Sequence, residues 1–422
     1  MVIIKKDGTK EPFDNGKVLK AIEKSAARVM HKITEPELNA FLAKLESALS
    51  NRESIPVSDM HNAVEAALES VMPDVAKSYK DYRNYKTDFV YMLDDVYQKA
   101  QSIMYIGDKD NANTDSALVA TKRSLVFNAL NKELYKKFFL TTEELQAAKD
   151  GYIYIHDMSA RRDTHNCDLI DLEAVMTGGF EMGNVWYNEP NSLDTAFDVM
   201  GDIIMSTASN QYGGLTVPEV DKTLAPYAEK SFKKYYDEYV KNSIDILNDV
   251  CVGKVYVVTD KVDELANEYA MKKVKRDFEQ GWQGIEYKLN TVGSSRGDYP
   301  FISVTIGLGT AVFEKMCAIT LLEVHGKGQG KKGFEKPVLF PKIVFLYDSK
   351  LHGDGCVNED VFKAGIECSS KAMYPDWLSL EPGSYVGDMY QKYGKVISPM
   401  GKCKLAHAKR CEPVYPQGCF WR

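Results

Sequence analysis

The chain has 422 residues, a formal net charge of −7 and 44% hydrophobic residues, so it is long enough for two or three domains with a sizeable core. The acidic balance and the lack of a long basic run argue against a protein that wraps nucleic acid. It has no apolar run of about 18 residues, no signal-peptide pattern in MVIIKKDGTK, and eight cysteines without a regular framework. We therefore expect a cytoplasmic protein with no membrane and no nucleic-acid partner.

Residues 2–14 predict a β-hairpin, because two short strand-like runs flank Asp7-Gly8, a dipeptide that tolerates the positive φ of a tight turn. Three amphipathic helices follow, and Thr34 with Glu37 predicts a capping box at the start of the second. We expect one compact unit of about 90 residues. The side chains predicted to face its core recur at three- and four-residue spacing: Val18, Ala21, Ile22, Ala26, Val29, Leu38, Phe41, Leu42, Leu45, Leu49, Met60, Ala63, Val64, Ala67, Leu68 and Val71.

Positive charge is concentrated on the hairpin and at the start of the first helix. Its lysines are Lys5, Lys6, Lys10 and Lys17. Ammonium groups beside a helix N-terminus suit a polyphosphate. A solvated lysine face is the alternative explanation, and the residues alone leave both open.

Residues 76–105 predict a long helix that links this unit to the rest of the chain. The polar loop Asn111–Asp115 suits hydrogen bonding to a sugar and a base, and it equally suits ordinary turn chemistry. Further along, four glycine-containing segments allow backbone to approach a ligand closely or simply turn a corner. These segments are Met176–Phe180, Gln211–Thr216, Gly293–Gly309 and Glu367–Trp377. Alternation of helical and short apolar segments predicts an α/β body.

A cysteine follows a capped helix and a strand pattern in the middle of the chain. Thr141 and Glu144 predict the helix, and the run YIYIHD from Tyr152 predicts the strand. Cys167 then follows a polar turn. A thiol at this position suits a redox or radical enzyme, whereas a buried cysteine that acts as a small hydrophobe is the ordinary alternative.

The N-terminal sequence VIIKKDGTKEPFDNGKV resembles an ATP-cone, the allosteric module that caps ribonucleotide reductases. The resemblance implies that ATP or dATP binds as an effector to matching positions of the hairpin and helices. These positions are Ile3, Lys5, Lys6, Glu11, Lys17 and His61. The second residue of the family's Lys-Arg pair is Lys6 here, which keeps the charge but lacks the bidentate guanidinium.

The body resembles the anaerobic, class III, ribonucleoside-triphosphate reductases to about residue 401. The motifs that carry this resemblance are NANTD, IHDMSARRDTHNCDLIDL, TGGFEMGN, QYGGLTVPEVDKTLAPY, FPKIVF and ECSSKAMYPD. It implies the first half of a ten-stranded α/β barrel of the glycyl-radical enzymes. The predicted domains are therefore 1–92 (ATP-cone), 93–401 (partial reductase barrel) and 402–422 (a tail unlike the family).

The family converts ribonucleoside triphosphates to 2′-deoxyribonucleoside triphosphates for DNA synthesis, using a glycyl radical and a thiyl radical. By resemblance, Cys167 is catalytic: its thiol protonates the leaving 2′-hydroxyl and donates a hydrogen or electron equivalent. His156, Asp157 and Asn166 are the implied substrate-binding residues, with His165 beside them. A radical-SAM activating enzyme and a homodimer are the implied partners.

The resemblance also implies a site for deoxynucleotide effectors that set specificity, at a dimer interface. Asp202 and Lys234 fall at corresponding positions. Asn188 and Asn191 occupy positions that carry charged residues in relatives. A plain surface role is the alternative for each of these four residues.

After Gly401 the sequence departs from the family, in which a cysteine that becomes the thiyl radical normally follows. Here Lys402-Cys403-Lys404 follows instead. We therefore expect a truncated chain that is inactive alone. A frameshift or gene break is the simplest explanation. The family's second half-barrel, four-cysteine zinc site and glycyl-radical loop would then be absent. The tail carries Cys403, His407, Cys411 and Cys419, which we attribute to chance composition, so no metal ligand is predicted.

Two alternatives remain from a different class of function. The chain would be a non-catalytic ATP- or dATP-binding regulatory fragment, or a half-enzyme that a second chain complements in trans. Another glycyl-radical enzyme, such as a lyase, fits less well because it has no need to sense nucleotides. The sequence leaves open whether formate or a thiol system is the reductant.

Overall fold

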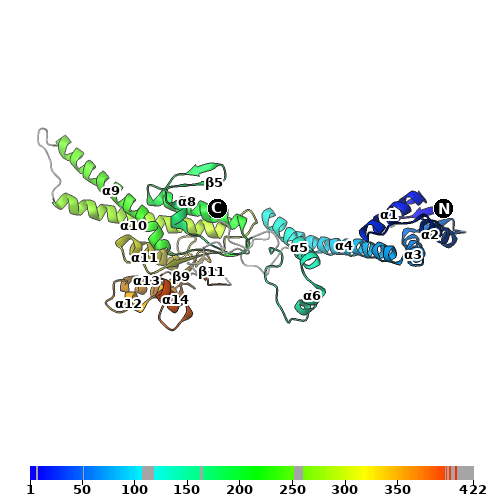
Figure 1. Ribbon diagram of the computed structural model, residues 1–422. Helices are drawn as coiled ribbons and strands as arrows, with labels where there is room; N and C mark the ends of the chain where they lie inside the picture. Colours follow the sequence, from blue (N-terminus) through cyan, green and yellow to red (C-terminus); the bar gives the residue numbers. More distant parts are fainter. Residues whose placement is uncertain are drawn as a thin grey trace. The chain divides into compact units, whose positions relative to one another are not determined.

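The computed structural model describes residues 1–5, 8–50, 52–106, 118–161, 165–250, 260–394, 396, 399–400 and 404–405 (Figure 1). The chain divides into two compact units, Met1–Lys99 and Ala100–Arg422. The predicted boundary between residues 92 and 93 falls inside one continuous helix, α4 (Pro73–Ile106). Lys6, the loop 111–115 and the tail cysteines lie outside the described residues.

The first unit pairs a small sheet with helices. Strands β1 (Val2–Ile4) and β2 (Lys10–Pro12) form the predicted antiparallel hairpin, and Gly8 has the positive φ of 82° that the turn requires. Strand β3 (Ser54–Pro56) pairs parallel with the other side of β1 and was not predicted. With only three residues, β3 has too short a pattern to stand out from the loop before the third helix.

The helices of this unit are α1 (Asn15–Arg28), α2 (Glu35–Leu49), α3 (Val57–Glu69) and the first part of α4. The capping box is confirmed, because Thr34 N donates to Glu37 Oε2 at 2.9 Å. The predicted inner faces meet in one core around Ile22, Phe41 and Leu68. The prediction was wrong for Val29, which is 39% exposed because α1 ends at Arg28 and Val29 is its C-cap.

The second unit begins with α5 (Val119–Phe139) and α6 (Thr142–Lys149). The predicted cap of α6 is confirmed, since Glu144 N donates to Thr141 Oγ1 at 3.2 Å. The strand predicted from Tyr152 was wrong. Tyr152 and Tyr154 are 84% and 87% exposed, and no strand among the described residues pairs with this segment. Without a neighbouring ladder its backbone stays irregular.

A five-stranded sheet in the order β10-β9-β8-β7-β4 forms the centre of the second unit, and all its neighbours are parallel. Its strands are β4 (Asp168–Leu169), β7 (Leu215–Val217), β8 (Ile302–Ile306), β9 (Lys342–Tyr347) and β10 (Asp376–Ser379). The predicted α/β class is confirmed. Within the described residues the strand number equals that predicted for one half of the barrel.

Helices join and cover this sheet. They are α7 (Leu172–Met176), α8 (Leu193–Asn210), α9 (Val220–Val250), α10 (Asp260–Thr291), α11 (Val312–Lys327), α12 (Ser349–His352), α13 (Glu359–Ser369) and α14 (Tyr385–Tyr393). The long helices α9 and α10 lie side by side (Figure 1). Two hairpins complete the unit, β5 (Phe180–Met182) with β6 (Val185–Tyr187), and β11 (Pro399–Met400) with β12 (Lys404–Leu405).

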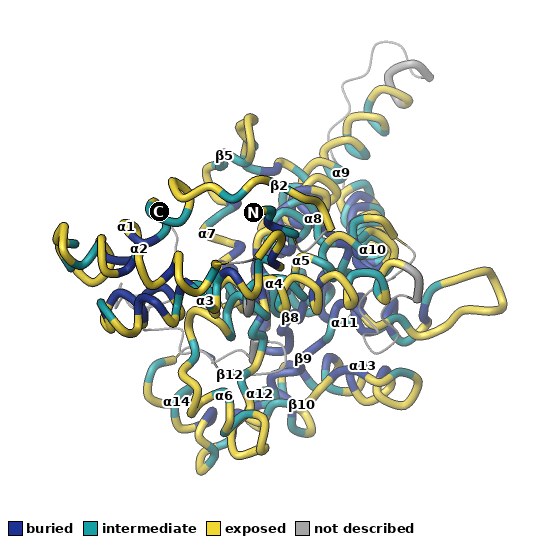
Figure 2. Tube along the Cα trace, turned by 90° about the vertical axis from the view of Figure 1, so that its right-hand side faces the viewer, coloured by how far each residue is buried: buried dark blue, intermediate teal, exposed yellow. Residues whose placement is uncertain are grey.

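The main core lies between these helices and the sheet. Strands β8 and β9 are buried along almost their whole length, as Figure 2 shows. Phe197 of α8 packs edge-on against Phe278 and Trp282 of α10. This core fixes β7 and β8, and with them the loops that precede these strands. In the described part of the chain, no helix combines the length and apolarity needed to cross a membrane.

Candidate functional site

Cys167 immediately precedes β4, the edge strand of the five-stranded sheet, and is half-buried. Backbone hydrogen bonds join its loop to the segment before β7. Tyr212 N donates to His165 O at 2.8 Å, and Asp168 N donates to Gly214 O at 3.1 Å. Burial raises the pKa of the Asp168 carboxyl, and the charge of His165 opposes that shift. The thiol is therefore held by a ladder of main-chain bonds on both sides.

Gly213 makes the closest approach to the cysteine. Its N–H donates to the carbonyl oxygen of Asn166. A β-carbon added at position 213 would lie 2.7 Å from Cys167 Sγ and 2.9 Å from Asn166 Oδ1. No ordinary side chain fits that space. The paired glycines of QYGGLT thus allow the backbone to approach the thiol and Asn166 closely.

A charged pair from a distant loop supports the same segment. Arg296 Nη1 donates to Tyr212 O at 3.2 Å, and the guanidinium carbon lies 5.4 Å from the centre of the Tyr212 ring. Asp298 pairs with Arg296 Nη2 at 3.3 Å. Burial lowers the pKa of Arg296 and raises that of Asp298. Reading the sequence missed both residues, although they lie in the glycine-containing segment 293–309 that it singled out.

Two buried polar atoms near this loop have no hydrogen-bond partner in the described residues. They are Gln211 Oε1 and Arg296 Nε. Gln211 is only 1% exposed, and its Nε2 donates to Gly213 O at 3.2 Å. Buried polar atoms are normally satisfied by protein, water or ligand. The surroundings of Cys167 therefore suit a polar ligand better than an inert apolar core.

His156 and Asp157, predicted to bind substrate, pair with each other. His156 Nδ1 lies 2.5 Å from Asp157 Oδ2, and Asp157 has a positive φ of 49°. Their turn reaches the cysteine's partner segment through Ser159, whose hydroxyl donates to Tyr212 Oη at 3.3 Å. The structure thus connects both residues to the thiol's surroundings through Tyr212.

Two of the predicted nucleotide residues of the first unit, Lys5 and Lys17, lie around a third, Glu11. Lys5 Nζ lies 2.8 Å and Lys17 Nζ 3.3 Å from Glu11 Oε2, and these lysines lower the pKa of Glu11. The hairpin and α1 therefore hold two ammonium groups around one point. The Ile3 side chain lies in the core, and strand β1 is paired on both sides.

His61 lies on α3 and contacts the long helix α4. Its Nδ1 is 2.7 Å from the hydroxyl of Tyr79, a residue that is 8% exposed and whose pKa burial raises to about 12. Arg83 of α4 also pairs with Glu65 of α3 at 3.0 Å. The predicted nucleotide contact is thus joined directly to α4.

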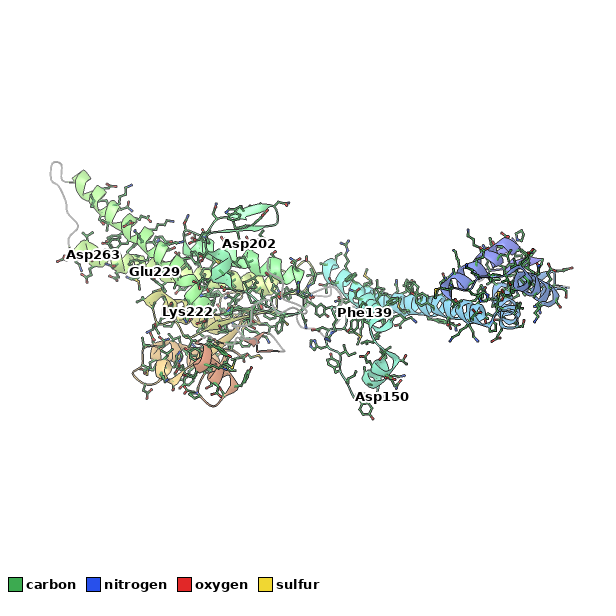
Figure 3. The ribbon with its side chains drawn as sticks, in the orientation of Figure 1. Phe139, Asp150, Asp202, Lys222, Glu229 and Asp263 are labelled. Carbon is green, nitrogen blue, oxygen red and sulfur yellow. The ribbon has the colours of Figure 1, made fainter. Side chains whose placement is uncertain are left out.

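Asp202 and Lys234, predicted to bind a specificity effector, lie on α8 and α9. Asp202 is beside the β5–β6 hairpin (Figure 3), where it accepts a hydrogen bond from Tyr187 Oη at 3.4 Å. Lys288 Nζ lies 3.6 Å from its other oxygen. The hydrogen bond from Ser192 lowers the pKa of Asp194, and the charge of Lys234 acts in the same direction. No described contact joins Asp202 to Lys234.

A cavity of about 390 Å³ lies between the β5–β6 hairpin and α8. It is lined by Val185, Trp186, Tyr187, Asn188, Glu189, Pro190, Asn191, Thr195 and Val199. Lys230 of α9 pairs with Glu189 at 2.5 Å. Tyr187 connects this cavity to Asp202. Asn188 and Asn191 are exposed and line this hollow.

Among the residues that the structure describes, no three His, Cys, Asp or Glu side chains are grouped as metal ligands. Cys403, His407, Cys411 and Cys419 lie outside those residues. Position 402, where relatives are expected to carry the cysteine that becomes the thiyl radical, also lies outside the described residues.

Comparison with known proteins gives matches for both units. The family model "Anaerobic ribonucleoside-triphosphate reductase" matches residues 110–415, and the model "ATP cone domain" matches residues 1–88. The chain is 29% identical over 408 residues to the anaerobic ribonucleoside-triphosphate reductase of Salmonella typhimurium, covering 94% of this chain and 53% of that protein. It is 32% identical over 297 residues to the enzyme of phage T4, covering 69% of this chain and 44% of that protein. The chain thus spans about half the length of these relatives.

Among solved structures, the chain is similar to the anaerobic ribonucleotide reductase from Thermotoga maritima in complex with dATP and CTP. The sequence identity is 14% and the TM-score 0.38, over 85% of this chain and 52% of that one. A second structure of the Thermotoga maritima protein, with citrate in the active site, gives 15% identity and a TM-score of 0.41 over 69% and 54% of the two chains.

Proposed function

Since the chain belongs to the anaerobic ribonucleoside-triphosphate reductase family, we propose that it takes part in the reduction of ribonucleoside triphosphates to 2′-deoxyribonucleoside triphosphates, with Cys167 as the thiol that acts on the ribose. The observation that carries this proposal is the close contact between Cys167 and Gly213. Cys167 of NCDLIDL and Gly213 of QYGGLT, 46 residues apart in the sequence, meet there with no room for a side chain between them.

The reaction replaces the 2′-hydroxyl of the ribose by hydrogen, and the hydroxyl leaves as water. A thiol next to the ribose protonates the leaving hydroxyl, and the thiolate that remains supplies an electron to the sugar. The reductant, formate or a thiol system, provides the remaining hydrogen equivalent. The role requires a held, partly shielded S–H, because an exposed thiolate is oxidised readily. The half-burial of Cys167 and the main-chain bonds around it fit this requirement.

Asn166, His156 and Asp157 are the proposed substrate-binding residues. Asn166 adjoins the thiol, and its side-chain oxygen faces the space above Gly213. The unpartnered Gln211 Oε1 adds an acceptor nearby. Hydroxyl and amide groups of a nucleotide suit such acceptors. The glycyl radical and the zinc site that the family resemblance implies have no residues assigned among those described, so we derive no step through them.

The first unit is the proposed effector site for ATP and dATP. Lys5 and Lys17 supply two ammonium groups, and Lys6 and His61 complete the set by resemblance. Asp202 and Lys234, with the cavity beside Tyr187, form the proposed site for deoxynucleotide effectors. A homodimer, a radical-SAM activating enzyme and a cytoplasmic location belong to the same proposal, as do the domain limits 1–92 and 93–401.

Formation of deoxynucleotide tests the catalytic part. The full chain is incubated anaerobically with the activating enzyme, a reductant, ATP and CTP, and dCTP is measured. We expect no dCTP from the chain by itself, as the sequence predicts, whereas the C-terminal half of a relative added in trans should give dCTP with the unmodified chain and none with Cys167→Ser. Equal dCTP formation by both would refute the role of Cys167.

A non-catalytic nucleotide-binding fragment is the second candidate. The separate core of the first unit favours it, because effector binding then needs nothing from the second unit. Binding of ATP with no dCTP formation, under conditions in which a relative turns over, would support this candidate. If calorimetric titration detects no binding of ATP or dATP in the micromolar range, this candidate is excluded.

A further inference from the structure

Arg296 belongs to the loop between α10 and β8, 129 residues after Cys167 in the sequence. It touches neither the cysteine's strand nor its turn in any described contact. Its contacts go to Tyr212, whose carbonyl oxygen accepts from Nη1 at 3.2 Å and whose ring faces the guanidinium at 5.4 Å. A guanidinium can hold a carbonyl and an aromatic face at once because it is planar and carries several donors.

Tyr212 and Gly213 connect Arg296 to the backbone around the thiol. Tyr212 N donates to His165 O at 2.8 Å, on one side of Cys167. Gly213 N donates to Asn166 O, and position 213 is the one that lies against Cys167 Sγ. A shift of the Tyr212–Gly213 peptide therefore moves the backbone on which the sulfur rests.

The Arg296 side chain is itself held in place. Asp298 pairs with it at 3.3 Å, and the two side chains are only 22% and 30% exposed. The next residue, Gly297, has a φ of 84°, and its carbonyl oxygen accepts from Thr121 Oγ1 of α5 at 2.8 Å. A β-carbon at Gly297 would collide with the Thr121 backbone. The loop is thus fixed against α5 on one side and against Tyr212 on the other.

We propose that Arg296 is a positioning residue for the Cys167 thiol, acting through the Tyr212–Gly213 peptide and oriented by Asp298. The inference rests on the proposed function, in which Cys167 is the reacting thiol. Its experimental signature is the geometry of that thiol, which is measurable without turnover. A failed deoxynucleotide assay therefore leaves this test intact.

The test is the rate at which iodoacetamide alkylates each cysteine of the full chain, resolved by peptide mass spectrometry. We expect Arg296→Gln to raise the Cys167 rate about tenfold, because a buried charge-assisted hydrogen bond is lost. Arg296→Lys keeps the charge and a donor, so its Cys167 rate should stay within about threefold of the unmodified chain. The half-buried Cys356 is the internal reference, and its rate should not change.

The buried Cys317 and Cys368 separate positioning from general loosening. If they become reactive in parallel with Cys167, Arg296 merely stabilises the fold and the proposal is overturned. An unchanged Cys167 rate in a folded Arg296→Gln protein overturns it as well. If Arg296→Gln does not fold, Asp298→Asn is the deciding variant. It removes the carboxylate that orients Arg296 but leaves the contact between Arg296 and Tyr212 possible. An unchanged Cys167 alkylation rate in Asp298→Asn also overturns the proposal.

Discussion

Gly213 and Cys167 are so close that a β-carbon at position 213 would lie 2.7 Å from the thiol sulfur. Real β-carbons do not approach a neighbour that closely, and the nearest atom to the added β-carbon is the backbone carbonyl oxygen of Asn166, which cannot yield easily. The residue at 213 is therefore constrained by the position of the cysteine, and the cysteine by the residue at 213.

We predict that Gly213→Ala displaces the Cys167 loop and lowers the free energy of unfolding by about 1–3 kcal/mol, the usual cost of overpacking. Urea unfolding of the full chain measures this change. Gly284→Ala is the matched control, because a β-carbon there meets nothing within 4 Å and the site lies inside α10. That control should be neutral or slightly stabilising. Equal stabilities of the two variants would contradict the close contact.

Lys17→Ala should weaken ATP binding by about tenfold, since one charge-assisted contact to the phosphates is removed. Isothermal titration calorimetry of the full chain measures the dissociation constant. Lys20→Ala is the control, because Lys20 is an exposed lysine of the same helix. If Lys17→Ala binds ATP as tightly as Lys20→Ala does, the lysines around Glu11 do not form the nucleotide site.

The pair His31–Asp74 predicts a pH-dependent term in the stability of the first unit. The two side chains lie 2.7 Å apart, with Glu37 at 3.5 Å from the other ring nitrogen. The hydrogen bond to Asp74 raises the pKa of His31 above its ordinary 6.5, and the same bond lowers the pKa of Asp74 below 3.8. The pair therefore stabilises the folded state fully between pH 3.8 and pH 6.5, the ordinary pKa values of the two groups. This stabilisation is lost as pH rises through the raised pKa of His31.

It is also lost in strong acid, as pH falls through the lowered pKa of Asp74. Unfolding of the full chain and of His31→Gln, compared from pH 4 to pH 9, measures the difference. We expect the gap between the two proteins to be largest near pH 5–6 and to shrink above pH 7. A gap that does not vary with pH would refute the charged pair.

Asp221, at the start of α9, gives a trend of the same sign from a different cause. It is 1% exposed, accepts from Gly307 N at 3.0 Å, and burial raises its pKa from 3.8 to about 6. Ionisation between those pH values therefore costs the folded state about 2–3 kcal/mol. In Asp221→Asn, the free energy of unfolding should no longer fall between pH 4 and pH 6. Asp198 is an exposed carboxylate of α8, so Asp198→Asn serves as the control and should show the same fall as the unmodified chain. Parallel pH profiles of all three proteins would contradict the assignment.

Local signals in the sequence predicted much of the fold. Thr34 with Glu37 and Thr141 with Glu144 mark helix starts that the structure confirms, because a capping box depends only on residues within one turn. The run from Tyr152 failed as a strand because a strand requires a partner, which local alternation cannot supply. Strand β3 was missed for the converse reason, since its pairing with β1 joins residues about 50 apart.

In the candidate site, too, local motifs were predictable from the sequence, whereas contacts between distant segments were not. Cys167 and Asn166 were predicted from their own motif, and the glycines at 213–214 were singled out from theirs. Their mutual contact needs the parallel pairing of β4 with β7, which no local pattern states. Arg296 and Asp298 were missed because the contact of Arg296 with Tyr212 joins residues 84 apart, and the Asp298 carboxylate pairs only with Arg296 in the described contacts.

The most direct test of the account is whether a ribonucleoside triphosphate protects Cys167 from alkylation. Full-length chain with ATP is treated with iodoacetamide with and without saturating CTP, and the rates at Cys167 and Cys356 are compared by peptide mass spectrometry. If Cys167 is the thiol that faces the ribose, CTP should slow its alkylation about tenfold or more while Cys356 reacts at the same rate. Unchanged alkylation of Cys167 in the presence of bound CTP would contradict the account.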